Sequence, residues 1–261
     1  MEIEILGPLN VRIADRSIVP RAGKPRQLLA LLALRSGHIV PIPTLMEELW
    51  GEHIPRSAQT TLQTYVLQLR RLIKTALPAD SPCTPKDVLI TRFGSYQLNS
   101  EPGLCDATLF QQKATAGTRA FEQGAAAEAS ALLGDALSLW RGPALADVPA
   151  GRILEIEMLA MDEARTRAQE LRLEADLQLG RHGEILGELM ILAAHHPLNE
   201  NICVLLMTAL HRSGHTWRAL EAYQQQRATL ARELGVAPSS RLQRLRQEIL
   251  GAGRSEERRA A

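Results

Sequence analysis

The sequence predicts a mainly helical protein with a small antiparallel β part, divided into two domains. Short strand patterns alternate with amphipathic helix patterns over residues 1–100, whereas helical periodicity runs from Cys105 to about Leu250. Aromatic residues make up 3% of the chain, and Ala and Leu are abundant, which favours helices. The length of 261 residues exceeds that of a usual single domain, so we expect two domains.

Charge is distributed unevenly along the chain, although the net charge is only +1. Residues 1–100 carry 12 Lys and Arg against 8 Asp and Glu, a net charge of +4, and the remainder carries 18 against 21, a net charge of −3. Because a basic surface attracts phosphate groups, the first half is the candidate nucleic-acid-binding half.

Several other classes of protein are excluded by composition and motifs. No apolar run reaches the length of a membrane span, and the N-terminus lacks a signal-peptide pattern, so we expect a cytoplasmic protein without membrane contact. Cys83, Cys105 and Cys203 are odd in number and far apart, which predicts neither disulfides nor a zinc site. The chain has no Gly-x-Ser-x-Gly elbow and no phosphate-binding Gly-rich loop ending in Lys. We therefore predict no enzymatic activity, no metal and no cofactor.

The first elements are expected to be short strands. Apolar residues alternate with polar ones over residues 2–5 and 11–13, and an apolar pair follows at residues 18–19. Turns are expected at Gly7-Pro8 and at Asp15-Arg16. This pattern predicts an antiparallel meander with one buried face.

Helices and a hairpin are expected after the meander. Pro25 suits the first turn of a nearly all-apolar helix over residues 25–34, and Gly37 provides its C-terminal stop. The apolar composition of this helix predicts a central position. The remaining elements are expected as a strand at residues 38–40, a helix at 43–50, a linker at 51–56, a helix at 57–74, a polar loop at 77–87, and a hairpin with strands at 88–91 and 96–98 around residues 92–95.

The helix over residues 57–74 has two different faces. An apolar stripe at spacings of three or four residues predicts burial of Ala58, Leu62, Val66, Leu69 and Ile73. No acidic residue interrupts the opposite face. That face holds Thr60, Thr64, Leu67, Arg71 and Lys74, with Gln63, Gln68 and Arg70 at its edges. Short hydroxyls allow close approach to DNA, Gln and Arg can bond base edges, and basic groups can meet phosphates. The alternative is an ordinary solvated polar face.

The order of a meander, three helices and a closing hairpin is that of a winged helix. Particular segments also carry a resemblance to a known family: Gly7-Pro8-Leu9, Lys24-Pro25-Arg26, Leu49-Trp50-Gly51-Glu52, Thr61-Leu62-Gln63-Thr64-Tyr65-Val66 and Leu69-Arg70-Arg71-Leu72. They resemble the OmpR-type winged helix of the Streptomyces antibiotic regulatory proteins. The chain departs from that family at the wing, where Ser95 rather than Gly precedes Tyr96 and Gly94 lies one position earlier.

The second half contains related segments. The segments that begin at Gly180 and Gly214 are 34 residues apart, which is the period of the tetratricopeptide repeat. A segment that matches them less well begins at Gly124. Ala219 and Tyr223 have the small-then-aromatic spacing of that repeat. Stacked helical pairs would bury a continuous core and leave a concave surface for a partner, and a general helical bundle is the alternative. Residues 139–145 and 233–238 resemble the bacterial transcriptional activation domain of the same regulators.

These observations predict a winged-helix DNA-binding domain over residues 1–102, a helical tetratricopeptide-like activation domain over 103–250, and a disordered tail over 251–261. The resemblance implies a transcription activator of antibiotic or other secondary-metabolite genes. It implies binding to direct repeats in double-stranded DNA beside a promoter, and contact with RNA polymerase holoenzyme including its sigma factor. We also expect protomers on adjacent repeats to associate. The competing hypothesis is an interaction scaffold whose repeats sense a protein or small ligand and whose winged helix binds no DNA.

Candidate site residues follow from this interpretation. Base-edge contacts are predicted for Thr60, Gln63, Thr64 and Leu67, and groove or phosphate contacts for Arg70, Arg71 and Lys74. Arg92 is the candidate for the wing's insertion into the minor groove, and Lys24, Arg26 and Arg56 are candidates for phosphate contacts at helix N-termini. The resemblance implies that the loop 51–56, beginning with Gly51, Glu52 and His53, faces the polymerase.

Overall fold

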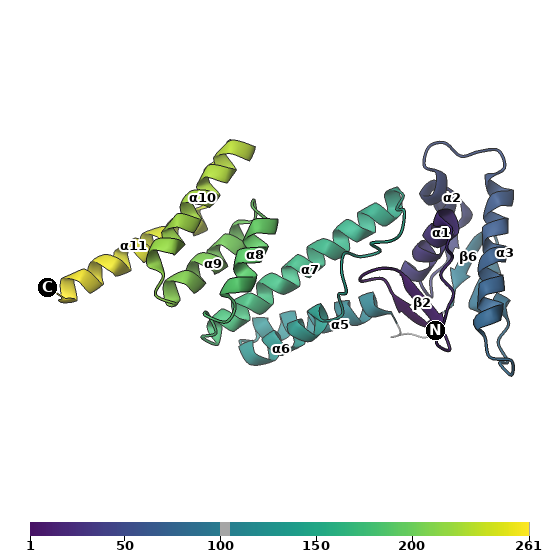
Figure 1. Ribbon diagram of the computed structural model, residues 1–261, viewed down its shortest axis with the longest axis horizontal. Coiled ribbons are helices and arrows are strands. Elements are labelled where there is room, and N and C mark those ends of the chain that lie inside the picture. The colour runs from purple at the N-terminus through teal and green to yellow at the C-terminus, as the bar shows by residue number, and fades with distance from the viewer. Residues whose placement is uncertain (100–104, 261) are drawn as a thin grey trace. The chain divides into compact units, whose positions relative to one another are not determined.

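A computed structural model describes residues 1–99 and 105–260, with side chains described as far as Gly251 (Figure 1). Its internal contacts group into two units. The first comprises Met1–Thr115 with Asp135–Thr166, and the second comprises Ala116–Gly134 with Arg167–Ala261. The domain boundary expected at residues 102 and 103 lies outside the described residues, so it stays a prediction. Each unit is described separately below.

The first unit begins with an antiparallel sheet in the order β1-β2-β3. Its strands are β1 (Glu2–Glu4), β2 (Asn10–Ile13) and β3 (Arg16–Ser17). The meander was predicted, but its third strand lies earlier than expected. Ala14 and Asp15 adopt positive φ angles of 45° and 64°, and this conformation reverses the chain within two residues. Pairing therefore resumes at Arg16 instead of at residue 18.

Helices and a second sheet complete the winged helix in the predicted order. The elements are α1 (Gly23–Leu34), β4 (Val40–Pro41), α2 (Ile42–Trp50), α3 (Ala58–Ala76), α4 (Pro85–Val88), β5 (Leu89–Arg92) and β6 (Ser95–Leu98). The second sheet has the order β4-β6-β5. Short helix α4 lies in a segment that was expected to be a loop. Thr84 and Asp87 form a capping box there, with Thr84 N donating to Asp87 Oδ2 at 2.8 Å, and the Thr-Pro-Lys-Asp sequence is the pattern that could have predicted it.

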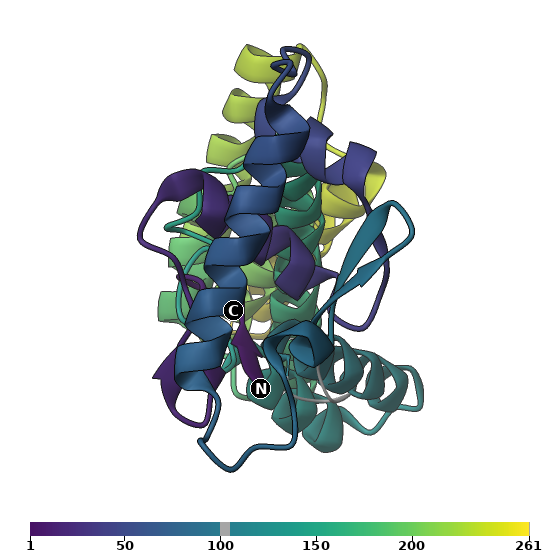
Figure 2. The ribbon, with the colours of Figure 1, turned by 90° about the vertical axis from the view of Figure 1, so that its right-hand side faces the viewer.

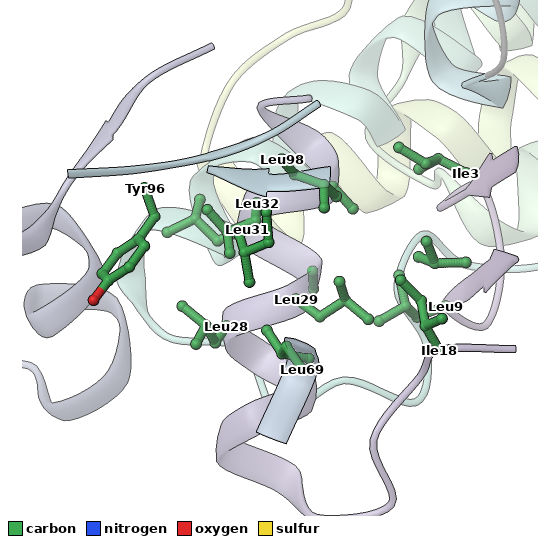
Figure 3. Close-up of a cluster of buried hydrophobic side chains, with 14 of the residues drawn as sticks. Ile3, Leu9, Ile18, Leu28, Leu29, Leu31, Leu32, Leu69, Tyr96 and Leu98 are labelled. Atoms are coloured by element: carbon green, nitrogen blue, oxygen red, sulfur yellow. The ribbon is translucent and has the colours of Figure 1, made fainter. Parts of the chain in front are cut away.

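The core of the first unit is built around α1, as its apolar sequence predicted. Leu28, Leu29, Leu31 and Leu32 are each at most 1% exposed. Figure 3 shows these side chains pointing toward residues of the first sheet, of α3 and of β6. The central helix therefore holds both sheets and α3 in one apolar cluster.

A segment after residue 140 also enters this core, which the sequence pattern did not indicate. Leu145 and Leu154 are fully buried in the same cluster as α1. Leu154 belongs to the first turns of α7 (Arg152–Gln178). The core of the winged helix therefore contains residues that lie about fifty positions beyond it in the chain.

Three carboxylates attach this segment and the start of α5 (Asp106–Glu122) to the winged helix, and we call Glu48, Asp106 and Asp147 the acidic clamp. Glu48 is 2% exposed and accepts hydrogen bonds from the backbone N–H groups of Gly151, Ile153 and Leu154, at 2.6, 2.9 and 3.0 Å. Asp106 accepts hydrogen bonds from the N–H groups of Ile5 and Leu6, which follow β1, and Asp147 accepts one from Leu9 N at 2.7 Å. Oriented N–H groups at a helix N-terminus stabilise a negative charge, so Glu48 serves as a cap for α7 supplied by another helix.

The second unit is helical and repeats one turn structure. Its elements include α6 (Ala126–Leu137), α8 (Leu186–His195), α9 (Glu200–Arg212), α10 (Thr216–Leu234) and α11 (Ser240–Ala260). Gly124, Gly180 and Gly214 have φ angles of 78°, 79° and 82°. The residue after each glycine donates its N–H to the carbonyl five positions back, at 2.9, 3.0 and 2.8 Å, which is the Schellman helix end.

Burial follows the same repeat. The residues five and nine positions after each glycine are buried, namely Ala129 and Leu133, Ile185 and Leu189, and Ala219 and Tyr223. The weak copy at Gly124 thus has the same local structure as the two stronger ones, although it lies 56 residues before Gly180 and not 34. The backbone of α11 continues to Ala260, through residues for which the sequence predicted a disordered tail. Ala, Arg and Glu dominate this segment and are good helix formers. Of the helices described, none has the length and apolar character needed to cross a membrane.

Candidate nucleic-acid interface

Helix α3 has the two faces that its sequence predicted. The residues of the predicted apolar stripe are each at most 2% exposed, and they pack in the core of the first unit: Ala58, Leu62, Val66, Leu69 and Ile73. Contacts with α1 and α2 hold this side of α3 in place. Burial of the stripe leaves the opposite side of the helix directed to solvent.

The solvent-facing side of α3, which we call the recognition face, consists of Thr60, Gln63, Thr64, Leu67, Arg71 and Lys74, all exposed. Thr64 Oγ1 donates to the carbonyl of Thr60 at 3.0 Å, so its hydroxyl is bonded within the helix. Within the described residues, the side chains of Gln63, Arg71 and Lys74 make no hydrogen bond or ion pair. Their donors are therefore available to a partner, and no carboxylate on α3 competes for them.

Arg70 has a different position from its neighbour Arg71. Its guanidinium donates to the carbonyl of Leu89 at 2.7 and 3.2 Å, and to Thr91 Oγ1 at 2.8 Å. Both acceptors lie on β5, the first strand of the wing hairpin. Arg70, which the sequence analysis put at the edge of this face as a candidate for groove or phosphate contact, therefore lies between α3 and the wing with its guanidinium bonded to β5.

The wing is the hairpin formed by β5 and β6, which lies to the right of α3 in Figure 2. Arg92 pairs with Ser95, so only Phe93 and Gly94 form the connection. Gly94 has a φ of 64°, so it supplies the conformation that side chains disfavour, and Ser95 is free to precede Tyr96. Arg92 Nε donates to Gln97 Oε1 at 3.2 Å along the hairpin, which leaves its terminal nitrogens exposed. Phe93, which the sequence analysis did not single out, is completely exposed at the tip.

Two basic residues predicted to contact phosphates have partners inside the first unit. Lys24 Nζ donates to the carbonyl of Leu49 and to Gln27 Oε1. Arg26 donates to the carbonyl of Pro20 at 3.0 Å and pairs with Asp147 at 3.1 Å. These contacts hold α1 to α2 and to the acidic clamp. Arg56, by contrast, is exposed immediately before α3, and the described residues give its side chain no partner.

The loop that the resemblance assigned to polymerase is open to solvent. Gly51 ends α2 with a φ of 58°, and Glu52, His53 and Ile54 are all exposed, the last at 50%. Nothing in the described residues covers this loop. An exposed apolar side chain between charged ones is suited to contact with another protein.

Among the side chains that the structure describes, no titratable groups form a catalytic arrangement. Burial raises the pKa of the Cys203 thiol to about 12, and it also raises the pKa of Cys105. Hydrogen bonds from Thr84 lower the pKa of Asp87, the capping residue of α4. In the part of the chain that the structure describes, no group of three or more His, Cys, Asp and Glu could hold a metal ion.

Known proteins resemble this chain over nearly its whole length. It is 50% identical over 252 residues to "Regulatory protein DnrI" of Streptomyces peucetius, covering 97% of this chain and 93% of that protein. It is 35% identical to "Transcriptional regulator RedD" of Streptomyces coelicolor, covering 96% of this chain and 70% of that protein. Among solved structures, "Mycobacterium tuberculosis EmbR in complex with low affinity phosphopeptide" matches with a TM-score of 0.87 and 32% identity, covering 96% of this chain and 65% of that one.

The winged helix with an open recognition face, followed by helical repeats, defines a DNA-binding transcription regulator and not an enzyme. Residues 105–250 match the family described as "Bacterial transcriptional activator domain", and residues 17–86 match "Transcriptional regulatory protein, C terminal". The chain belongs to the Streptomyces antibiotic regulatory protein family, and it is a transcription activator of that family.

Proposed function

We propose that the recognition face of α3 enters the major groove at direct repeats beside promoters of a secondary-metabolite gene cluster, where the protein recruits RNA polymerase. Thr60, Gln63, Thr64 and Leu67 lie toward the N-terminal half of α3 and would meet base edges. Arg71, Lys74 and Arg56 would meet base edges at the rim of the groove or phosphates. Such a function would place the protein in the cytoplasm, at the nucleoid.

One observation carries this proposal, namely that the recognition face is exposed, free of acidic residues and supplied with unpaired donors. A duplex carries about one negative charge per 1.7 Å of its axis, so a carboxylate on this face would oppose binding. Threonine and leucine methyl groups fit against thymine methyls, while Gln63 and Arg71 can each make two hydrogen bonds to a base. The chemical groups present therefore match those that the major groove displays.

The structure changes the roles that we propose for other basic residues. Arg70 would set the position of the wing relative to α3, because both of its acceptors are on β5. Lys24 and Arg26 would hold α1 in place instead of contacting phosphates. These positioning roles make the geometry of the interface depend on residues that do not touch DNA.

Recruitment of polymerase is supported by the exposed loop 51–56. It lies directly between α2 and α3, so a protomer seated on DNA would present it close to the duplex. Glu52, His53 and Ile54 offer charged and apolar groups for a protein partner, such as the sigma factor of the holoenzyme. Contacts between helical domains of protomers on adjacent repeats would add affinity through effective concentration.

The test is Arg71→Ala, compared with Arg227→Ala as a matched control, since Arg227 is an exposed arginine of α10. If Arg71 bonds guanine, the loss should be about 1–3 kcal/mol and confined to cognate DNA. If it meets only phosphate, cognate and random DNA should weaken alike, and the salt slope should fall by about 0.9. Equal affinities for both variants and the unmodified protein would remove Arg71 from the interface, and the absence of any salt-dependent DNA binding would favour the interaction scaffold.

A further inference from the structure

Phe93 occupies an unusual position for an aromatic residue. Its side chain has a relative exposure of 107%, so no other part of the described chain covers it. It lies at the tip of a two-residue connection, between Arg92 of β5 and Gly94. Scattered exposed apolar residues are common on protein surfaces, but a phenylalanine at a fully solvated hairpin tip gains nothing from the fold itself.

The backbone beneath Phe93 is held firmly. Ser95 Oγ donates to the carbonyl of Phe93 at 3.1 Å, and the N–H of Ile42 donates to the carbonyl of Gly94 at 2.9 Å. The second of these bonds ties the tip to the start of α2. The ring is therefore presented to solvent on an anchored hairpin.

The wing is also fixed relative to the recognition helix. Arg70 on α3 bonds to Leu89 and Thr91 on β5, so the hairpin and α3 are linked by direct hydrogen bonds within the first unit. Arg92 is bonded to Gln97 along the hairpin. Phe93 therefore lies at the tip of a hairpin whose first strand is bonded to α3.

We infer that Phe93 is an apolar wedge that enters the minor groove beside the segment read by α3 and partly unstacks one base step. This inference rests on the proposed DNA-binding function and adds an element of specificity to it. Apolar side chains that enter the minor groove kink the duplex at the step where they insert. Pyrimidine–purine steps unstack most easily, so the wing would select TA or CA steps without any hydrogen bond to a base.

The charges around the tip agree with a nucleic-acid partner. Arg92 immediately precedes Phe93 and is exposed, and within the described residues only its Nε is bonded, to Gln97. Its positive charge would therefore lie close to the phosphates when the ring enters the groove. No acidic residue lies in the hairpin from Leu89 to Leu98. A protein partner would be the competing occupant of this tip, and the experiment below treats it as an outcome.

The experiment uses the full chain and a duplex library with randomised flanks around the selected repeats. Phe93→Ala and Phe93→Trp are compared with Ile39→Ala, an exposed apolar residue of the same unit that is outside the hairpin. The readouts are the selected flanking sequence, affinity, the bend of an end-labelled duplex by energy transfer, and the fluorescence of 2-aminopurine placed at the enriched step. Thermal melting checks that each variant folds, as expected for positions exposed at 107% for Phe93 and 54% for Ile39.

We expect the unmodified protein to enrich a pyrimidine–purine step at a fixed distance from the bases read by α3. Phe93→Ala should abolish this enrichment, reduce the bend and the 2-aminopurine response, and weaken binding about 10-fold, because stacking on an aromatic side chain is lost. Phe93→Trp should retain all of these properties, and Ile39→Ala should leave them unchanged.

Four results would overturn the inference. Phe93→Ala could select the same flanks and bend DNA equally, which would leave no role for a wedge. It could lower transcription at equal occupancy without altering the DNA, which would assign Phe93 to a protein contact. If the unmodified protein selected no sequence at all, the proposed function itself would fail, and the wedge with it. An enriched core sequence without an enriched step would refute the wedge alone.

Discussion

Replacing Glu48 with alanine should destabilise the first unit more than any surface substitution in it. The carboxylate is 2% exposed and accepts hydrogen bonds from Gln27 Nε2 at 2.7 Å and from the N–H groups of Gly151, Ile153 and Leu154. Alanine would remove all of these acceptors and leave a void beside the start of α7. Buried donors that lose their partner cannot recover it from solvent without local rearrangement.

The magnitude can be worked out from these contacts. A hydrogen bond to a charged group contributes about 1.5–3 kcal/mol, and a buried group left unsatisfied costs about 1–3 kcal/mol. These values do not add, because the start of α7 would relax and admit water. We therefore expect a total near 3–5 kcal/mol, the range found when one partner of a buried charged contact is removed. A loss of that size is a large fraction of the ~5–15 kcal/mol that stabilises a domain.

The assay is urea unfolding of the full chain combined with hydrogen exchange at the amides of residues 151, 153 and 154. Glu48→Ala should lower the stability of the first unit and speed exchange at these amides, while amides of α9 in the second unit keep their protection. Glu47→Ala is the matched control, because Glu47 is the exposed neighbour on the same helix and should change stability by less than about 0.5 kcal/mol. If the free energy of unfolding of Glu48→Ala lies within about 1 kcal/mol of that of the unmodified protein, which is near the error of the assay, and its amides stay protected, the clamp does not hold α7.

Other substitutions test the remaining assignments. Leu62→Asp places an unpaired charge in the core, which costs several kcal/mol. Circular dichroism should therefore show loss of cooperative melting in the first unit but not in the second. Normal folding of this variant would mean that the buried and exposed faces of α3 are reversed. Arg70→Ala should lower stability by about 1–3 kcal/mol in urea while leaving the salt slope of DNA binding unchanged, whereas a fall of about 0.9 in that slope would show that Arg70 does meet a phosphate. A fragment of residues 1–102 should melt at a lower temperature than a fragment of residues 1–166, because only the longer one contains Leu145, Leu154, the N–H donors to Glu48, and the clamp carboxylates Asp106 and Asp147. Equal melting temperatures would contradict this account of the core. For Cys203, the pKa of about 12 in the folded state predicts slow alkylation by iodoacetamide at pH 8, while exposed Cys83 reacts readily. The thiol of an unfolded chain ionises at pH ~8.5, so the stability contributed by the neutral thiol of folded Cys203 should be complete below that pH and be lost as the pH rises toward 12. Rapid labelling of Cys203 in the native protein would refute its burial.

The sequence by itself determined the features that depend on neighbouring residues. The spacing of Leu62, Val66 and Leu69 predicted which side of α3 is buried, because helical geometry alone brings residues three and four apart to one face. The glycine period in the second half predicted its repeated turns, since a left-handed helix end is a local requirement. The order of strands and helices, together with the family motifs, predicted the winged helix and its class of function.

Only the tertiary structure decided the roles that depend on distant partners. Arg70 and Arg71 are adjacent and chemically identical, and their side chains differ in their contacts because β5 lies on one side of α3, which no local pattern expresses. Glu48 would be expected on a solvated helix face, yet it is buried because residues more than one hundred positions later bring N–H groups to it. Likewise, the turn at Phe93 was predicted, but its complete exposure follows from the pairing of Arg92 with Ser95 and from the bond between Ile42 and Gly94. Each of these outcomes requires the three-dimensional position of a partner, which short-range periodicity does not contain.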